Sequence, residues 1–186
     1  MRKPAVLLII ALLGATPISG QSVNFRIGAA DANVRQADEY VGKVSVDDSS
    51  APAGAVYLDF PRSGGLTTRI GALWIRKGLA HYVELPVLVL FGRDPGNDGL
   101  DLFVAVGASL GIRALCFDVV LGCFHSEKSY DFSGTLGAGF AVPIPWGEGW
   151  SFGAEISLLR GLVRIDETTW TEAVLATAGI GIPVRR

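Results

Sequence analysis

The chain has 186 residues, a formal net charge of −2 at pH 7, 49% hydrophobic residues and only 18% charged residues. The near-neutral charge argues against a nucleic-acid-binding protein, which normally presents a basic patch, and the charged fraction lies below the roughly 25% of typical soluble domains. The mean hydropathy is +0.40, and the 24 glycines would not favour a membrane helix after the first residues. In lipid, a closed β-barrel is the remaining way to satisfy the backbone.

Residues 1–20 predict a secretory signal peptide. Arg2 and Lys3 give a basic start, and an apolar run follows that is too short to span a bilayer as a helix. Small residues precede the expected cleavage site after Gly20. The remaining residues, 21–186, have the length of a single domain.

Eight strands are predicted in the mature part of the chain, most of them from alternation of apolar with polar or small residues. Their ranges are 23–30, 54–60, 66–76, 80–91, 100–113, 130–142, 150–159 and 173–184. Several reach the 9–11 residues that a tilted membrane strand needs. Residues 31–53 are expected to form a long polar loop. Its acidic residues favour a solvated loop over a weak divalent-ion site; they are Asp31, Asp38, Glu39, Asp47 and Asp48.

The stretch LDLFVAVGASLGIR, residues 100–113, decides between a soluble core and a membrane barrel. One face is apolar throughout and holds Leu102, Val104, Val106, Ala108, Leu110 and Ile112. The other holds Asp101, Phe103, Ala105, Gly107, Ser109, Gly111 and Arg113. A water-facing strand usually carries Lys, Glu and Thr, whereas a narrow barrel needs small residues inside. The pattern therefore predicts an all-β, eight-stranded antiparallel up-and-down transmembrane β-barrel whose apolar face meets lipid.

Aromatic residues fall near the predicted strand ends, as in the two girdles of membrane barrels. One band is expected to hold Phe25, Phe91, Trp146 and Trp150. The other is expected to hold Trp74, Tyr82, Tyr130 and Trp170.

Five charged residues are expected on the inward face: Arg26, Arg69, Glu84, Asp101 and Glu155. Charges inside a small barrel are costly unless they are paired and hydrogen-bonded. We therefore expect a salt-bridged network that plugs the lumen. The alternative is a gated, charge-lined pore, which an eight-stranded lumen hardly has room for.

The segment CFDVVLGCFHSE, residues 116–127, is the most distinctive predicted loop. Cys116 and Cys123 are close enough in sequence for a disulfide in an exported protein, and the pair could equally stay reduced. A metal site with His125 lacks a fourth ligand and a standard zinc spacing. His125, Ser126 and Glu127 are consecutive, and their spacing does not bring a nucleophile and base together. We expect no catalytic residues, metal or cofactor.

Five segments resemble the PorT-like outer-membrane β-barrel family: LTTRIGALWIRKG, HYVELPVLVLFG, LFVAVGASLGI, YDFSGTLGAGFAV and SFGAEISLLRGLVRID. The resemblance covers most of the mature chain and implies an eight-stranded outer-membrane barrel. It implies no catalytic residue.

We therefore expect an integral protein of the outer membrane of a Gram-negative-type bacterium, exported by its signal peptide, with a structural or interaction role. Its expected partners are outer-membrane lipid and a protein that binds the extracellular loops. The alternatives are a soluble periplasmic barrel that carries an apolar ligand, a narrow pore and a lipid-modifying enzyme.

Overall fold

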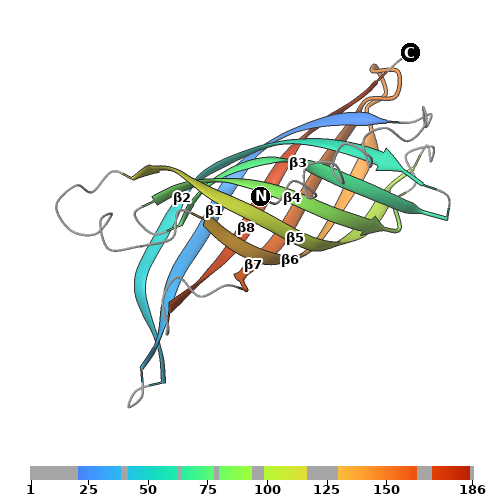
Figure 1. The fold of residues 1–186 in the computed structure, drawn as a ribbon. Helices are drawn as coiled ribbons and strands as arrows, with labels where there is room; N and C mark the ends of the chain where they lie inside the picture. The colour runs from blue at the N-terminus through green and yellow to red at the C-terminus, as the bar shows by residue number, and fades with distance from the viewer. Residues whose placement is uncertain are drawn as a thin grey trace, which may run out of the picture.

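The structure is a computed structural model that describes residues 21–38, 42–62, 64–77, 80–93, 99–116, 130–162 and 169–184. Its strands are β1 (Ser22–Asp38), β2 (Gly42–Pro61), β3 (Leu66–Lys77), β4 (Ala80–Phe91), β5 (Asp101–Cys116), β6 (Tyr130–Pro143), β7 (Ser151–Gly161) and β8 (Thr169–Pro183). Consecutive strands pair antiparallel, and β1 also pairs with β8, so the sheet closes into a barrel (Figure 1). The predicted eight-stranded antiparallel fold is confirmed. Within the described ranges, no helix is long and apolar enough to cross a membrane.

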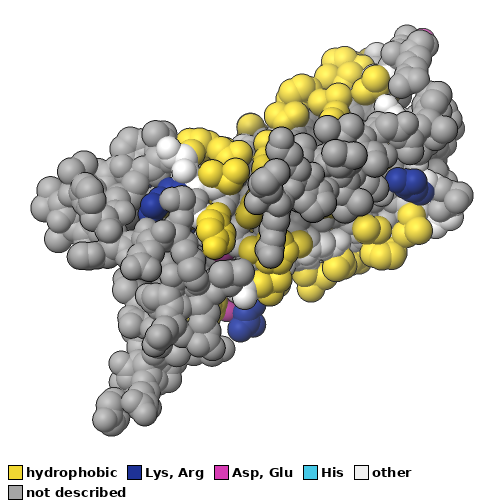
Figure 2. Space-filling model, in the orientation of Figure 1, with side chains coloured by type: hydrophobic (Ala, Val, Ile, Leu, Met, Phe, Trp, Pro, Cys, Tyr) yellow, Lys and Arg dark blue, Asp and Glu magenta, His cyan; other side chains and the backbone are white. Residues whose placement is uncertain are grey.

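The two faces of the barrel wall follow the period of two in the sequence. In β5, Leu102, Val104 and Val106 are exposed, whereas Phe103 and Ala105 are buried. The other strands show the same alternation, so large hydrophobic side chains cover the outside. Figure 2 shows them along the visible wall, with basic side chains only toward its ends. The predicted orientation of the apolar face is confirmed, and it is the opposite of the orientation that a carrier with an apolar cavity requires.

Residues 31–38 and 42–53, which belong to the segment predicted as a loop, instead continue β1 and β2 as paired strands. The register runs from Asp31↔Ser50 to Asp38↔Gly42, with a shift between Val34 and Arg35. The strand predicted at 54–60 therefore begins at Gly42 and has 20 residues. The loop prediction is wrong because ladder hydrogen bonds continue along the backbone after the apolar alternation of the side chains has ended.

Inward-facing glycines allow the closing strands to approach each other. A Cβ atom at Gly179 would lie 1.9 Å from the carbonyl oxygen of Phe25, and one at Gly28 would lie 1.9 Å from that of Ala176. Both contacts join β1 to β8, the pair that closes the barrel. These glycines are therefore required by close backbone approach, as expected at bends in a barrel.

Candidate functional site

The interior of the barrel holds two networks of buried ion pairs. The first network consists of Arg26, Asp59, Arg69, Arg93 and Glu155. The second network consists of Lys77, Glu84 and Asp131. All eight residues are buried. Their charges are therefore held in pairs, as buried charges must be.

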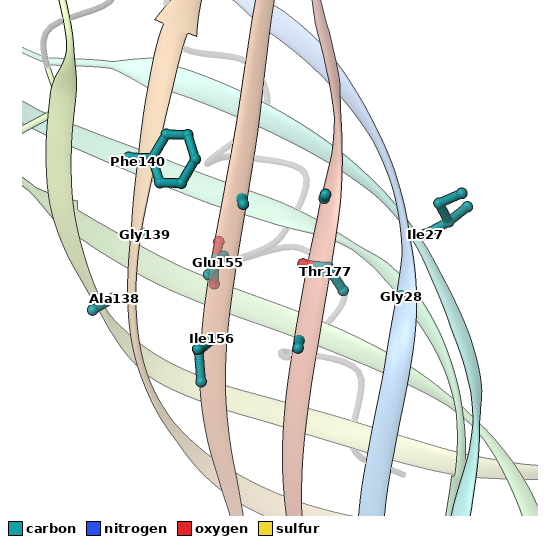
Figure 3. Close-up of a pocket in the computed structure, with 11 residues that line it drawn as sticks. Ile27, Gly28, Ala138, Gly139, Phe140, Glu155, Ile156 and Thr177 are labelled. Atoms are coloured by element: carbon teal, nitrogen blue, oxygen red, sulfur yellow. The ribbon is translucent and has the colours of Figure 1, made fainter.

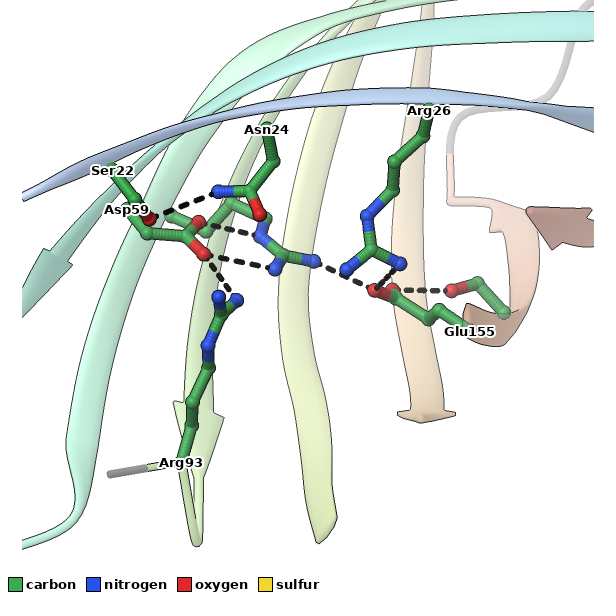
Figure 4. Close-up of polar contacts among 8 residues, drawn as sticks. Ser22, Asn24, Arg26, Asp59, Arg93 and Glu155 are labelled. Carbon is green, nitrogen blue, oxygen red and sulfur yellow. Dashed lines mark hydrogen bonds and ion pairs between the residues drawn. The ribbon is translucent and has the colours of Figure 1, made fainter. Parts of the chain in front are cut away.

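Arg69 on β3 is the centre of the first network. Its Nε and Nη2 donate to the two carboxylate oxygens of Asp59 on β2, at 2.7 and 3.0 Å. Its Nη1 donates to Oε2 of Glu155 on β7, at 2.6 Å, and Arg26 on β1 lies 3.3 Å from the same oxygen. Figure 4 shows these contacts as a chain of alternating charges. Because the chain joins strands from both sides of the barrel, it acts as a strut across the lumen.

Arg93 enters the first network from the segment that follows β4. Gly92 precedes it with a φ of 88°, a left-handed conformation that favours glycine, and redirects the chain at the strand end. The Arg93 guanidinium pairs with Asp59 and lies 5.8 Å from the ring centroid of Phe103, whose ring also contacts Arg69 at 5.6 Å. Burial lowers the pKa of Arg93, and the Asp59 carboxylate opposes that shift. Arg93 thereby lies near the end of the barrel where β1 begins, at Ser22, and β8 ends, at Pro183.

In the second network, one ammonium group is shared by two carboxylates. Lys77 Nζ lies 2.5 Å from Glu84 Oε1 and 2.6 Å from Asp131 Oδ2. The Thr171 hydroxyl also donates to Asp131 Oδ2, at 2.8 Å. This network joins β3, β4, β6 and β8, so it ties together strands that are not neighbours in the sheet.

Four of the five charged residues predicted on the inward face belong to these two networks. Arg26, Arg69 and Glu155 meet in the first network, and Glu84 belongs to the second. Asp101 is buried and lines, with Arg93, a cavity of about 100 Å³ at the end of the barrel.

Four members of the networks were missed by sequence reasoning: Asp59, Lys77, Arg93 and Asp131. Asp59 follows the outward-facing Leu58 in β2 and faces inward. Strict alternation along this strand could therefore have identified Asp59 as a lumen residue. Lys77 and Arg93 lie just outside the predicted strands 66–76 and 80–91. Nothing in the local pattern indicates that their long side chains reach back into the lumen.

Other sequence-predicted residues lie at or beyond the edge of what the structure describes. Cys116 is the last residue of β5, and Cys123, His125, Ser126 and Glu127 lie outside the described residues. The disulfide, the metal alternative and the hydrolase alternative therefore stay predictions. In the part of the chain that is described, no group of three or more His, Cys, Asp or Glu is arranged to hold a metal ion.

The predicted aromatic bands need one correction. Phe25, Phe91, Trp74, Trp146, Trp150 and Tyr130 have exposed side chains, but Tyr82 is only 7% exposed and belongs to the buried core. Tyr82 lies at an inward position of β4, with its ring 5.5 Å from Lys77 Nζ. It contributes to the lumen, and its proximity to the strand end in sequence was misleading.

A groove of about 430 Å³ lies on the outer surface across β1, β6, β7 and β8 (Figure 3). Exposed Ile27 and Ile156 stand beside small residues such as Ala138 and Ala176. Its two polar lining residues, Glu155 and Thr177, are buried and sit at inward positions of their strands. The groove is therefore an apolar part of the exterior and lacks the convergent polar groups of a catalytic site.

Comparison with solved structures finds proteins of similar fold. The N-terminal β-barrel domain of Pseudomonas aeruginosa OprF matches with a TM-score of 0.50 and 10% identity, over 83% of this chain and 96% of that chain. Ail, the attachment invasion locus protein of Yersinia pestis, in complex with the heparin analogue sucrose octasulfate, matches with a TM-score of 0.45 and 15% identity, over 87% of this chain and 99% of that chain. No protein-family model matches the chain, and comparison with curated proteins finds no match. The likeness to the OprF domain shows a shared β-barrel fold.

Proposed function

We propose that this protein is an integral outer-membrane β-barrel with a structural or interaction role. The observation that carries the proposal is the inverted distribution of side chains. Large hydrophobic residues cover the outside of a closed barrel, while eight charged residues form buried ion pairs inside. A soluble domain would bury the apolar set, because exposed apolar patches of this extent are rare on soluble monomers. The fold likeness to the OprF barrel domain supports the β-barrel fold on which the proposal rests.

The two networks favour a closed lumen over a pore. Each network spans the interior with hydrogen bonds between strands, and the residues around them are packed. An eight-stranded barrel has room for little else. With a closed lumen, the parts available to partners are the outer wall and the segments beyond the membrane. We propose no enzymatic activity, and membership of the PorT-like family stays a prediction from the sequence patterns.

Membrane fractionation followed by electrophoresis of boiled and unboiled samples tests the proposal. We expect the protein in the outer membrane and expect faster migration of the unboiled sample, because a closed barrel resists detergent. Release of the protein by osmotic shock, as a monomer that is stable without detergent, would contradict it.

A further inference from the structure

The outer wall formed by β3 and β4 carries its basic side chains at one end only. Arg76 and His81 lie directly opposite each other in the β3–β4 ladder. Both occupy outward positions, because the neighbouring inward positions hold the buried Lys77 and Tyr82. The outward residues of β3 and β4 include no acidic side chain. This end of the wall therefore presents a positive charge without a carboxylate on the same two strands.

Trp74 packs beside the basic pair. The centroid of its indole ring lies 5.2 Å from that of the His81 imidazole, with the ring planes 30° apart. Trp74 pairs with Val83 in the ladder, so His81 is its diagonal neighbour. The indole is exposed on the wall. Tryptophan is enriched at the interface between hydrocarbon and water, where one end of its ring system is apolar and the other can be hydrated.

The apolar wall next to the pair has the height of a bilayer core. Every outward residue of β4 after His81 is apolar: Val83, Leu85, Val87, Val89 and Phe91. From His81 to Phe91 the strand advances by about 33 Å. At the usual tilt of membrane strands this length rises by roughly 25 Å, which is the height of the apolar band of such barrels. The pair therefore stands at the edge of this band, at the level of lipid headgroups.

The edge that carries Arg76 and His81 is the outer one in the proposed orientation. Ala80 pairs with Cys116 at this end of the barrel, and Cys116 precedes the longest connection between two strands, residues 117–129. The long connections of outer-membrane barrels are extracellular. The inference therefore rests on the proposed function, because only an outer-membrane barrel places this pair beside the outer leaflet.

The opposite wall has a different electrostatic character at the same end. β7 lies four strands from β3 in either direction around the closed barrel. Its outward Arg160 lies 3.7 Å from Glu172 on β8, so the cation there is balanced by a carboxylate. An anionic ligand is therefore favoured beside β3 and β4 over the wall formed by β7 and β8.

We propose that Arg76 and His81 bind the phosphate group of an anionic lipid in the outer leaflet, whose acyl chains lie along β3 and β4. A guanidinium presents several N–H donors in a fork that matches phosphate oxygens, and an imidazole N–H supplies one more donor. The apolar wall begins beside the pair, so both parts of an amphiphile find a matching surface. A free phosphate ion would use the basic pair alone.

Native mass spectrometry of the protein, folded in detergent micelles, tests the proposal. The probes are dioleoyl phosphatidic acid, dioleoyl phosphatidylcholine and inorganic phosphate. The two lipids have the same chains, and only the first has an anionic headgroup. We expect adducts with phosphatidic acid at concentrations at which phosphatidylcholine and inorganic phosphate give none.

Two arginine variants locate the headgroup. Arg76→Gln should weaken the binding of phosphatidic acid by about tenfold or more, the loss expected for a charge-assisted hydrogen bond. Arg160→Gln is the matched control, because it removes an outward arginine at the same end of the opposite wall, and it should leave binding unchanged. Heat-modifiable migration of both variants establishes that each forms a barrel.

Tryptophan fluorescence locates the acyl chains. Phosphatidic acid with brominated chains should quench the wild type, and most of this quenching should disappear in Trp74→Phe. Equal quenching in Trp74→Phe would exclude contact between the chains and this wall.

The other outcomes that would overturn the inference are also distinct. Unchanged affinity of Arg76→Gln would place the headgroup elsewhere. Equal affinity for phosphatidylcholine would mean that the chains alone are bound, and binding of inorganic phosphate alone would mean an ion site without a lipid. Fractionation tests the membrane location separately. A soluble protein would overturn the proposed function, whereas a membrane protein with an unaffected Arg76→Gln variant would overturn only this inference.

Discussion

Two glutamates on the barrel wall form ion pairs in opposite environments. Glu155 is buried and serves both Arg26 and Arg69, whereas Glu172 lies 3.7 Å from Arg160, whose side chain is 62% exposed. Glu155→Gln should lower the free energy of unfolding by about 3–5 kcal/mol, because two buried guanidinium groups lose a shared partner. Glu172→Gln should cost about 0–1 kcal/mol, because water screens the exposed pair.

Urea unfolding of both glutamine variants in the same detergent or lipid measures this difference. The two substitutions are chemically identical, so their comparison isolates the effect of burial. Similar losses for both variants would mean that the first network does not stabilise the barrel.

The outward position of Val106 gives a second prediction for a single residue. Val106 is 44% exposed on the outer wall of β5, opposite Leu136 and Val89 on its two neighbouring strands. In the proposed membrane, Val106→Arg should cost about 2–4 kcal/mol near the bilayer midplane and reduce assembly. Val106→Leu keeps the apolar surface and serves as the control. Heat-modifiable migration and outer-membrane yield measure the effect, and normal values for the arginine variant would contradict a lipid-facing position.

At the scale of elements, the closing pair of β1 and β8 depends on glycine. Gly179→Ala places a methyl group against the Phe25 carbonyl oxygen, and the backbone must move to relieve the contact. We expect a loss of about 1–3 kcal/mol in unfolding free energy, as for other overpacked sites. Gly134→Ala should cause no comparable loss, because the nearest atom to its added Cβ would lie 3.6 Å away in the Leu162 side chain. Refolding yield and urea titration of the two alanine variants compare these cases, and equal stability would show that the β1–β8 contact relaxes freely.

The strands show how far the sequence predicts structure here. Alternation placed the apolar faces of β4 and β5 correctly, because a half-buried strand has one side-chain environment on each face. It failed for residues 31–38 and 42–53, where backbone hydrogen bonds continue the pairing of β1 with β2 although the sequence lacks a regular apolar alternation. Tyr82 was assigned by its distance from the strand end, although its inward position in β4 decides its environment.

Alternation along the strands also predicted only some of the residues in the two ion-pair networks. Arg26, Arg69, Glu84 and Glu155 occupy inward positions inside strands, where the period of two identifies them. Lys77 and Arg93 stand at or beyond strand ends, and only the closed barrel brings their side chains to Asp131 and Asp59. The curvature and register of the whole sheet decide which charged residues form pairs. A local sequence pattern does not contain this information.

For the whole molecule, we propose that the first network stiffens the barrel and closes its lumen. Its charged groups come from β1, β2, β3 and β7 and from the segment after β4, so no single hairpin contains the strut. Opening a conducting path requires breaking several charge-assisted hydrogen bonds at once in a poorly hydrated interior. We therefore expect the wild type, reconstituted in planar lipid bilayers, to show no resolvable single-channel steps.

Removing the centre of the strut should open the lumen. Arg69→Ser/Asp59→Ser deletes one charge of each sign and much side-chain volume, so the formal charge of the interior is unchanged while the bidentate contact is lost. We expect this variant to show conductance steps, after heat-modifiable migration has established that it forms a barrel. Arg160→Ser/Glu172→Ser is the control: it removes an ion pair of the same kind from the exterior and should show no conductance steps. Conductance in the wild type would contradict a closed lumen. Absence of conductance in Arg69→Ser/Asp59→Ser would mean that the second network and the surrounding apolar side chains close the lumen.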